Sequence, residues 1–537
     1  MSRWQRYWFA EGGRTSLAVV RIAVALATLV VLQLLATLST VEIPGPPELY
    51  RPVGIWMVFG RWVPPDAVFT LLWILAFTST TAMLFGFATR ISTAVSFVTA
   101  VALASASYAS SASWSHPFNV VLLAHLALLG ARAGDTLSID EMIRIHRGLP
   151  PVNVPRGYQW SLRLVQLAVA LMFFGAAWHK LRSGGLGLRW ALSDNLRHHL
   201  LVRYDLAGLD RPPLVDWLLE ESWRYRAAAL GNLFSQAAPF LACVFVRRPL
   251  VRLACGGIFA LEVLGLGLVV TLWNYHWFPL VAVFVDWEWL LGKLRLPVTE
   301  PPPTPPARDD RRAVQVFIVA YLLYYVATAF IPSIDQRLNT YPFSAFPMFA
   351  SIRATPPLDQ HMPYSVPGDR YEVTSDHPIS VEAQRWFDHH NRWLYDLKDP
   401  AKLETRMRSI LAAAQARYPE AGIRGVRHRF MMFEVPAYPG EARFEPRPIA
   451  TLAELRPDGT FRSVFGKLTK DGVELRPQNV EAKSVRLVYY LNDLPVAHQL
   501  TATRDGDRFV TGPLKGKPLT VIAIIDGQPW LAARRKK

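Results

Sequence analysis

The chain has 537 residues, of which 51% are hydrophobic and only 19% are charged, a balance that excludes an ordinary soluble enzyme of this length. Lysine and arginine together number 58 against 42 for aspartate and glutamate, which gives a net charge of +16. No basic patch is interleaved with aromatic residues on a soluble module, so we exclude nucleic acid as a partner and assign the excess to cytoplasmic loops and anionic lipid. The composition predicts a polytopic α-helical membrane protein that contacts the lipid bilayer.

Apolar runs predict about nine transmembrane helices. They cover residues 16–38, 67–88, 91–111, 117–129, 161–181, 227–246, 251–272, 277–291 and 313–330. Arginine-rich stretches at 132–156 and at Arg247-Arg248 fall on one side of this map. Because positive charge is retained in the cytoplasm, we expect a cytoplasmic amino terminus and an extracytoplasmic carboxyl-terminal domain.

These runs divide the chain into four predicted parts. Residues 1–296 form a transmembrane domain, 297–312 a proline-rich linker, 313–332 an additional transmembrane helix, and 333–537 an extracytoplasmic domain of helices followed by strands. From residue 425 onward, apolar and polar residues alternate between turn signals such as PDG and KDG. This pattern predicts a C-terminal soluble α+β domain that is antiparallel and β-sandwich-like, an architecture more typical of binding modules than of catalytic centres.

The fifth predicted span ends at Trp178, His179 and Lys180, and a glycine-rich turn follows it. The lysine can serve as an anchor that reaches for lipid phosphates, since lysine and tryptophan are common at the ends of membrane helices. Alternatively the amine is buried and accepts a proton, because a low dielectric favours its neutral form. The sequence leaves both interpretations open.

Two further ionisable residues accompany Lys180. His116 precedes the fourth span and Lys180 closes the fifth, and because successive helices run in opposite directions, both residues reach the same outer face. Glu262 lies near the middle of the seventh span. A carboxyl group at that depth is costly unless it faces protein or water, so it is either a functional group or a hydrogen-bonded lock between two helices.

No metal site is predicted. The adjacent pairs His198-His199 and His389-His390 would diverge on a helix, which makes each pair a poor chelate. The sequence also lacks zinc-ligand spacing, a phosphate-binding glycine loop after a strand and a Ser-His-Asp elbow.

Three segments carry a resemblance to a known family. They read QLAVALMFFGAAWHKL at 166–181, with Trp190 downstream, SWSHPFNVVLLAHL at 113–126, and GDTLSIDEMIRIHR at 134–147. Together, over about residues 14–291, they resemble the vitamin K-dependent γ-carboxylase-like family, or HTTM domain, in its bacterial membrane form. The resemblance places the motifs of the family in the predicted transmembrane domain, and it implies a multi-pass protein of a bacterial inner membrane whose carboxyl-terminal domain is periplasmic.

In that family, the lysine matched by Lys180 is the proposed base that deprotonates a reduced quinone, and the histidine matched by His116 binds the oxyanions formed later. The resemblance implies a quinol-dependent carboxylase or epoxidase-like lyase that uses a reduced quinone of the vitamin K or menaquinol type, O2 and CO2. Its expected partner is a secreted peptide or protein substrate. The residues that would line the quinone or substrate pocket are Trp178, His179, Arg182, Trp190, Gln166 and Glu262.

The sequence also departs from this family. His179 stands where vertebrate carboxylases have the first of two lysines, and the spacing before His116 is Trp-x-His rather than Trp-x-x-His. The carboxyl-terminal region shows no match to the propeptide- or glutamate-binding segments of the carboxylases. The alternative hypothesis is a non-catalytic membrane maturation or scaffold factor that binds lipid or peptide.

Overall fold

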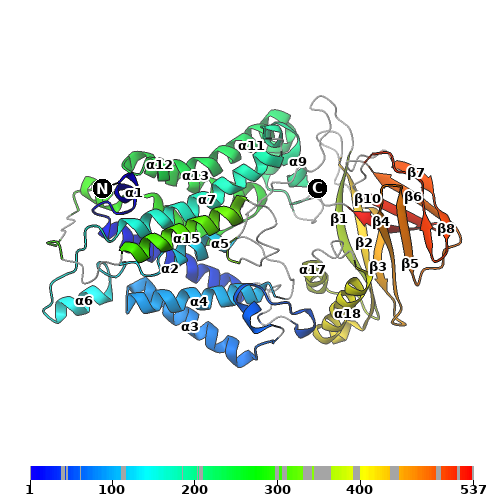
Figure 1. The fold of residues 1–537 in the computed structure, drawn as a ribbon, viewed down its shortest axis with the longest axis horizontal. Helices are drawn as coiled ribbons and strands as arrows, with labels where there is room; N and C mark the ends of the chain where they lie inside the picture. The colour runs from blue at the N-terminus through cyan, green and yellow to red at the C-terminus, as the bar shows by residue number, and fades with distance from the viewer. Residues whose placement is uncertain are drawn as a thin grey trace. The chain divides into compact units, whose positions relative to one another are not determined.

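The computed structural model describes residues 2–37, 43, 46–60, 62–109, 117–183, 186–201, 203–204, 210–296, 301–304, 311–330, 341–343, 364–390, 399–435, 447–490, 497–516 and 520–534. The chain forms two compact units. The helical unit comprises Met1–Gly45, Arg51–Leu192 and Ala227–Ser351, and the sheet unit comprises Pro46–Tyr50, Ser193–Arg226 and Ile352–Lys537. Figure 1 draws the strands of the sheet unit in yellow to red.

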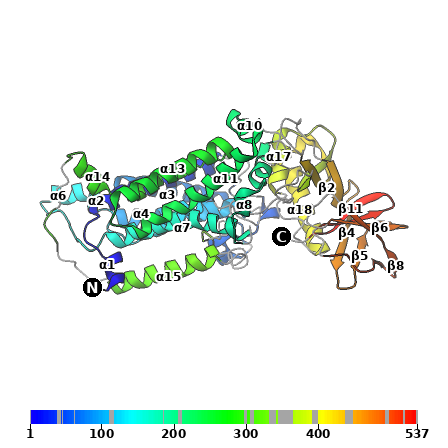
Figure 2. The same ribbon diagram turned by 90° about the horizontal axis from the view of Figure 1, so that it is seen from above.

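Seven helices among the described residues are long and apolar enough to cross a membrane. In chain order they are α2 (Arg14–Thr37), α3 (Asp66–Phe85), α4 (Thr89–Ser107), α7 (Gln159–Ser183), α11 (Ser222–Ala237) continued by α12 (Leu241–Val244), α13 (Pro249–Val270) and α15 (Arg311–Phe330). Figures 1 and 2 show these helices lying along one another as a bundle. Their length and apolar composition identify a membrane protein.

The fourth and eighth predicted spans, the two shortest of the nine, contain no helix long enough to cross a membrane among the described residues. The fourth contains α5 (Asn119–Leu126), an α-helix of 8 residues, and the eighth overlaps η5 (Tyr275–Phe284), a 3-10 helix of 10 residues with Pro279 inside it. In an α-helix the Pro279 ring would clash with the carbonyl group four residues earlier, which favours the 3-10 form here. Seven of the nine predicted spans therefore correspond to helices long enough to cross a membrane.

Shorter helices occupy the connections. They are α1 (Arg3–Trp8), η1 (Pro47–Leu49), η2 (Gly54–Phe59), α6 (Ile139–His146), α8 (Arg189–Leu192), α9 (Asn195–Leu201), α10 (Pro213–Glu220), η4 (Ala238–Phe240) and α14 (Trp287–Lys293). The Ser138 side chain caps α6 by accepting a hydrogen bond from the Glu141 amide, and the Asp286 side chain caps α14 in the same way from Trp289. Side-chain caps of this kind satisfy amides that have no partner within the helix.

Buried arginines organise one end of the helical unit. Arg21 donates to the carbonyl oxygens of Ala133 and Leu137, each at 2.6 Å, and Arg252 forms an ion pair of 2.8 Å with Asp286. Arg14 donates to Val152 O at 2.9 Å and to the Glu141 carboxylate at 2.6 Å, and these contacts tie the start of α2 to the loop before α7. We call this region the arginine end.

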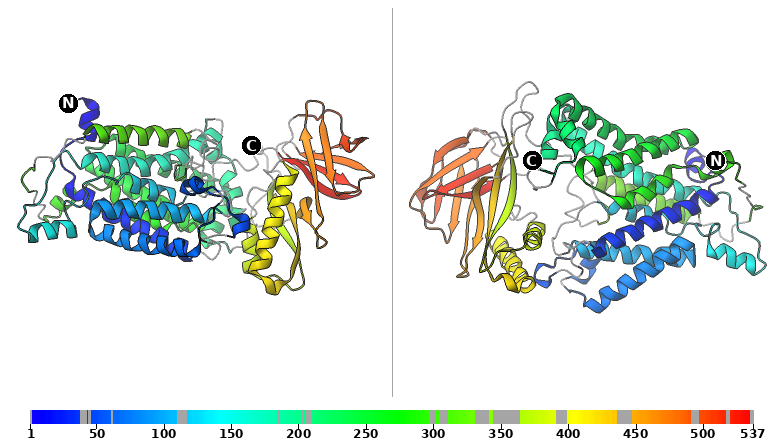
Figure 3. Two further views of the ribbon diagram at one scale, coloured as in Figure 1. Left: turned by 60° about the horizontal axis from the view of Figure 1, so that its bottom comes forward. Right: turned by 180° about the vertical axis from the view of Figure 1, so that it is seen from behind.

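The sheet unit contains one sheet of eleven strands among the described residues. The strands are β1 (Tyr364–Ser375), β2 (Ile423–Val435), β3 (Arg447–Leu455), β4 (Phe461–Leu468), β5 (Val473–Gln478), β6 (Val485–Tyr490), β7 (Ala497–Thr501), β8 (Thr503–Asp505), β9 (Arg508–Val510), β10 (Thr520–Ile525) and β11 (Gln528–Arg534). Their order is β7-β6-β10-β11-β3-β4-β5-β9-β8, and β2 links β1 to β3. Helices α17 (Val381–His390) and α18 (Pro400–Arg417) precede β2, and Figure 3 shows α18 beside the strands.

This sheet is nearly closed and barrel-like, which corrects the predicted β-sandwich. The hairpin of β10 and β11 joins the two halves, because β10 pairs with β6 and β11 pairs with β3 through Trp530 and Thr451. Side chains of successive β10 residues point to opposite faces of the sheet, so they pack in two different hydrophobic cores. Ala523 packs inside the curled sheet with Leu487, whereas Ile522 packs on the face that α18 covers.

Candidate functional site

Lys180 lies in the last turn of α7 and is only 1% exposed. Its ammonium group donates to the side-chain oxygen of Gln236 at 2.9 Å and to that of Asn232. Because a snorkelling lysine holds its amine in water or among lipid phosphates, this geometry favours the buried amine over the anchor. The amine also meets the requirement that a buried charge be paired or hydrogen-bonded.

Helix α11 supplies the polar partners of Glu262, which is 5% exposed on α13. The amide nitrogens of Asn232 and Gln236 donate to Glu262 Oε1 at 2.7 and 2.9 Å. The hydroxyl group of Ser235 donates to Glu262 Oε2. Asn232, Ser235 and Gln236 are spaced i, i+3 and i+4, so they project from one face of α11 toward the carboxylate.

The two charges are linked through amides rather than directly. Each of the two carboxamides accepts a hydrogen bond from Lys180 and donates one to Glu262. Hydrogen bonds polarise one another in a low dielectric, so this arrangement transmits the attraction between the ammonium and the carboxylate. We call Lys180, Asn232, Ser235, Gln236 and Glu262 the lysine–glutamate network.

Trp190 completes the surroundings of the amine. It lies on α8, is 1% exposed, and places its ring so that Lys180 Nζ is 4.5 Å from the ring centroid. This is a cation–π distance, and such contacts are stronger where water is excluded. The structure thus brings the predicted catalytic residue Lys180 together with two of the predicted pocket residues, Glu262 and Trp190.

Four other predicted pocket residues lie elsewhere. His179 turns to α15, where its Nε2 is 2.8 Å from Ala329 O. Trp178 is 36% exposed and Arg182 is also exposed. The Gln166 side chain donates to Val283 O at 2.9 Å, and a helical rise of 1.5 Å per residue puts it about 21 Å from Lys180.

His116 lies outside the described residues. Besides His179, the described part of the helical unit buries His125 and His276. His276, which is 1% exposed on η5, holds its Nε2 2.8 Å from the carbonyl oxygen of Pro117. His125 on α5 is fully buried, with its Nε2 3.0 Å from Thr93 O. Sequence reasoning singled out neither imidazole.

Sequence reasoning also missed Asn232, Ser235 and Gln236. Their signal was present, because they interrupt the apolar run of α11 at the spacing of one helical face. Polar side chains on one face of a membrane helix are typical of contacts with another helix. Searching each span for such a face would have marked α11 as a helix with a polar contact, although not Glu262 as its partner.

Comparison with known proteins returns no relative. No family model, curated protein or solved structure matches this chain. Among the described residues, no group of three or more His, Cys, Asp or Glu side chains is arranged to hold a metal ion. The lysine–glutamate network is therefore the feature from which we argue function.

Proposed function

We propose that this chain is an integral membrane enzyme in which Lys180 accepts a proton from a lipid-soluble substrate of the hydroquinone class. The observation that carries the proposal is the full burial of the amine among apolar helices, with its nitrogen held by two neutral amides. Ionisable groups at this depth in a membrane protein are expensive and commonly functional. Removal from water also favours the neutral form of an amine, which is the form that can accept a proton.

The neighbouring residues have complementary roles in this proposal. Lys180 takes the proton at Nζ, and Glu262 balances the resulting positive charge through Asn232 and Gln236. Trp190 offers an aromatic face beside the same nitrogen, which suits the flat ring of a hydroquinone. An amine, an aromatic face and a dry environment together fit a phenolic hydroxyl group.

The full reaction follows the family that residues 113–126, 134–147 and 166–181 resemble. A reduced quinone of the vitamin K or menaquinol type and O2 would yield the quinone epoxide and one water. Two electrons come from the hydroquinone and two from the epoxidised double bond, which together reduce O2 completely. In the proposed coupling, the strong base formed on this path removes a proton from a carbon of a secreted peptide or protein, to which CO2 can add.

The proposed topology has nine passes with a cytoplasmic amino terminus. The starts of α4 and α7 both contact the loop that carries Asp135 and Asp140, through Thr89 and Tyr158. Because α4 and α7 start at the same end, the chain must return between them through the segment that contains α5. In the same way, η5 returns the chain from the end of α13 to Asp286 at the arginine end.

The test is product formation by the purified full chain in lipid nanodiscs supplied with reduced menaquinone and O2. We expect the epoxide by mass spectrometry from wild type and from Lys293→Met, which changes an exposed lysine on α14. We expect none from Lys180→Met/Glu262→Gln, which removes both buried charges and leaves no unpaired ion. Epoxide formation by a folded double variant would contradict the proposal.

A second candidate is the non-catalytic maturation or scaffold factor. It is favoured by the completeness of the network, since Lys180 and both carboxylate oxygens of Glu262 all have partners. Such a network can lock α7, α11 and α13 together without chemistry. This candidate predicts no epoxide from wild type, together with thermal stability that depends on the network.

A further inference from the structure

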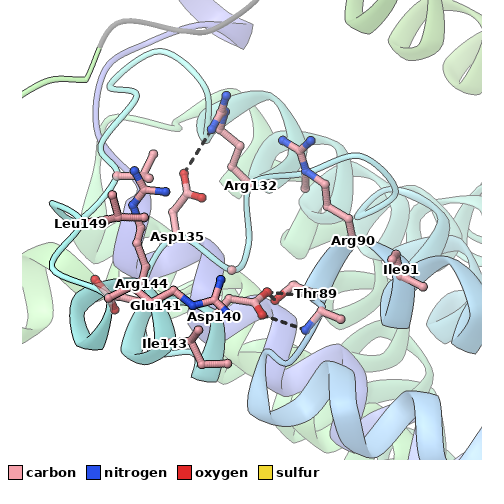
Figure 4. Close-up of a pocket in the computed structure, with 15 residues that line it drawn as sticks. Thr89, Arg90, Ile91, Arg132, Asp135, Asp140, Glu141, Ile143, Arg144 and Leu149 are labelled. Atoms are coloured by element: carbon pink, nitrogen blue, oxygen red, sulfur yellow. Dashed lines mark hydrogen bonds and ion pairs between the residues drawn. The ribbon is translucent and has the colours of Figure 1, made fainter.

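A pocket of about 640 Å³ lies at the arginine end of the helical unit. The junction of α3 and α4 forms one side, and the loop from Ala131 to Val152, which includes α6, forms the other. Figure 4 shows the guanidinium groups of Arg90 and Arg132 on the same side of this pocket. The pocket is separate from the lysine–glutamate network and has no part in the proposed reaction.

The carboxylates that line the pocket already have hydrogen-bond or ion-pair partners within the protein. Asp140 accepts hydrogen bonds from the amides of Ala88 and Thr89, both at 2.8 Å, and Glu141 forms an ion pair with Arg14 at 2.6 Å. Asp135 accepts a hydrogen bond of 3.1 Å from the hydroxyl group of Tyr158 and lies 3.6 Å from Arg132. Their negative charge is therefore directed at the protein and not at the open side of the pocket.

Three arginines of the pocket retain donor capacity. Arg90 and Arg147 are exposed, and the described contacts give neither of them a hydrogen bond or an ion pair. Arg144 donates from Nε to Pro150 O at 2.6 Å, and its two terminal nitrogens have no described partner. Arginine presents its donors in a planar fork that matches phosphate oxygens.

Two exposed apolar side chains line the pocket: Ile91 at the start of α4 is 69% exposed, and Leu149 is 47% exposed. Met142 and Ile145, which are 69% and 54% exposed, lie on the face of α6 that does not line the pocket. On its other side, α6 carries Asp140, Glu141 and Arg144, so it is a short amphipathic helix. Such a helix lies at the boundary between lipid head groups and acyl chains.

We propose that this pocket binds the phosphate of an anionic phospholipid head group, with the acyl chains lying against Ile91 and α6. The phosphate meets Arg90, Arg144 and Arg147, whose donors are free of carboxylates. The occupant is a lipid and not a soluble phosphoester, because the apolar residues around the rim would otherwise face water. The site would fix an anionic lipid at the end of the bundle where α3 and α4 meet.

The test compares two double variants of equal charge, in nanodiscs that contain phosphatidylglycerol and phosphatidylcholine. Arg90→Gln/Arg147→Gln changes the pocket, and Arg247→Gln/Arg248→Gln changes two exposed arginines that do not line it. Native mass spectrometry after detergent transfer counts the retained lipids. We expect the pocket variant to retain at least about tenfold less phosphatidylglycerol than wild type, since each arginine contributes about 1 kcal/mol toward binding an anionic surface.

We expect the control variant to retain phosphatidylglycerol as wild type does, and both variants to melt at the wild-type temperature. Equal retention by both variants would overturn the proposal. Displacement of the lipid by millimolar glycerol 3-phosphate would also overturn it, since the site would then recognise a soluble phosphoester.

Discussion

At the scale of single residues, the helical unit keeps a positive and a negative side chain in an apolar bundle by placing two carboxamides between them. Lys180 and Glu262 are 1% and 5% exposed, and Asn232 and Gln236 each contact both. Transferring either charge out of water costs several kcal/mol unless it is hydrogen-bonded. The two charges therefore depend on one another for stability as well as for the proposed chemistry.

This dependence predicts strong coupling between substitutions. Lys180→Met leaves Glu262 buried without its counter-ion, so we expect it to destabilise the protein by about 3–5 kcal/mol. Lys180→Met/Glu262→Gln leaves no charge behind, and we expect it to recover most of that loss. Thermal unfolding of the single and double variants in one detergent measures the coupling energy. Additive effects would show that the two side chains act separately.

Asp135, outside the predicted spans, gives a pH-dependent prediction. Burial raises the pKa of Asp135 above its usual value, although Arg132, the Tyr158 hydroxyl group and Arg14 act in the opposite direction. Because the folded state holds this proton more tightly than the unfolded state, ionisation of Asp135 lowers stability as pH rises from about 3.9 through the raised pKa.

We expect Asp135→Asn to remove that loss, since an asparagine does not ionise. The melting temperature of the variant relative to wild type should therefore increase between pH 4 and pH 7. A difference that stays constant over this range would show that Asp135 ionises equally well in both states.

At the scale of elements, the sequence was sufficient where the signal is local. Seven helices could be predicted because each carries a long apolar run within one continuous segment. The 3-10 form of η5 was not predicted, because a hydropathy average does not register Pro279. The single sheet was not predicted either, since the pairing of β11 with β3 joins Trp530 to Thr451, 79 positions apart in the sequence.

The same distinction applies to the candidate site. Lys180, Trp190 and Glu262 could be selected as unusual residues in or after apolar runs, and the structure brings these three together. Their partners on α11 depend on which helices are neighbours, and the apolar pattern of a single sequence does not specify that neighbour. The orientation of His179 toward Ala329 likewise follows from the packing of α15 on α7.

Closure of the sheet can be tested at Gly466 on β4. A Cβ atom at this position would lie 3.0 Å from Ala532 O and 3.1 Å from Ala532 Cβ on β11, so β4 and β11 approach closely inside the curled sheet. We expect Gly466→Val to destabilise the sheet unit by about 1–3 kcal/mol, the usual cost of overpacking. Limited proteolysis of the full chain against temperature measures the loss.

Gly512 provides the matched control, because a Cβ atom there would have no neighbour within 4 Å. We expect Gly512→Val to leave the proteolysis profile unchanged. Equal profiles for both variants would contradict the close approach of β4 and β11.

At the scale of the whole molecule, the chain combines a membrane unit with a sheet unit, each with its own core. The lysine–glutamate network and the pocket at the arginine end both belong to the helical unit. In the proposed orientation, the arginine end faces the cytoplasm and the sheet unit lies outside the membrane. That orientation follows from the retention of positive charge in the cytoplasm.

Orientation can be tested with single cysteines, because Cys243 and Cys255 are both buried. Lys470 lies in the exposed turn between β4 and β5, and Lys293 is exposed at the end of α14. We expect a membrane-impermeant maleimide to label Lys470→Cys in cells with a permeable outer membrane, and Lys293→Cys only after the inner membrane is opened. The reverse pattern would invert the proposed topology.

The most direct test of proton acceptance by Lys180 is hydroquinone-dependent O2 uptake in nanodiscs, followed continuously with an electrode while the epoxide is quantified. We predict uptake by wild type and Lys293→Met with one epoxide formed per O2 consumed, and background uptake by the Lys180→Met/Glu262→Gln variant that is still folded at the assay temperature. The same rate and epoxide yield from wild type and the folded double variant would contradict the account.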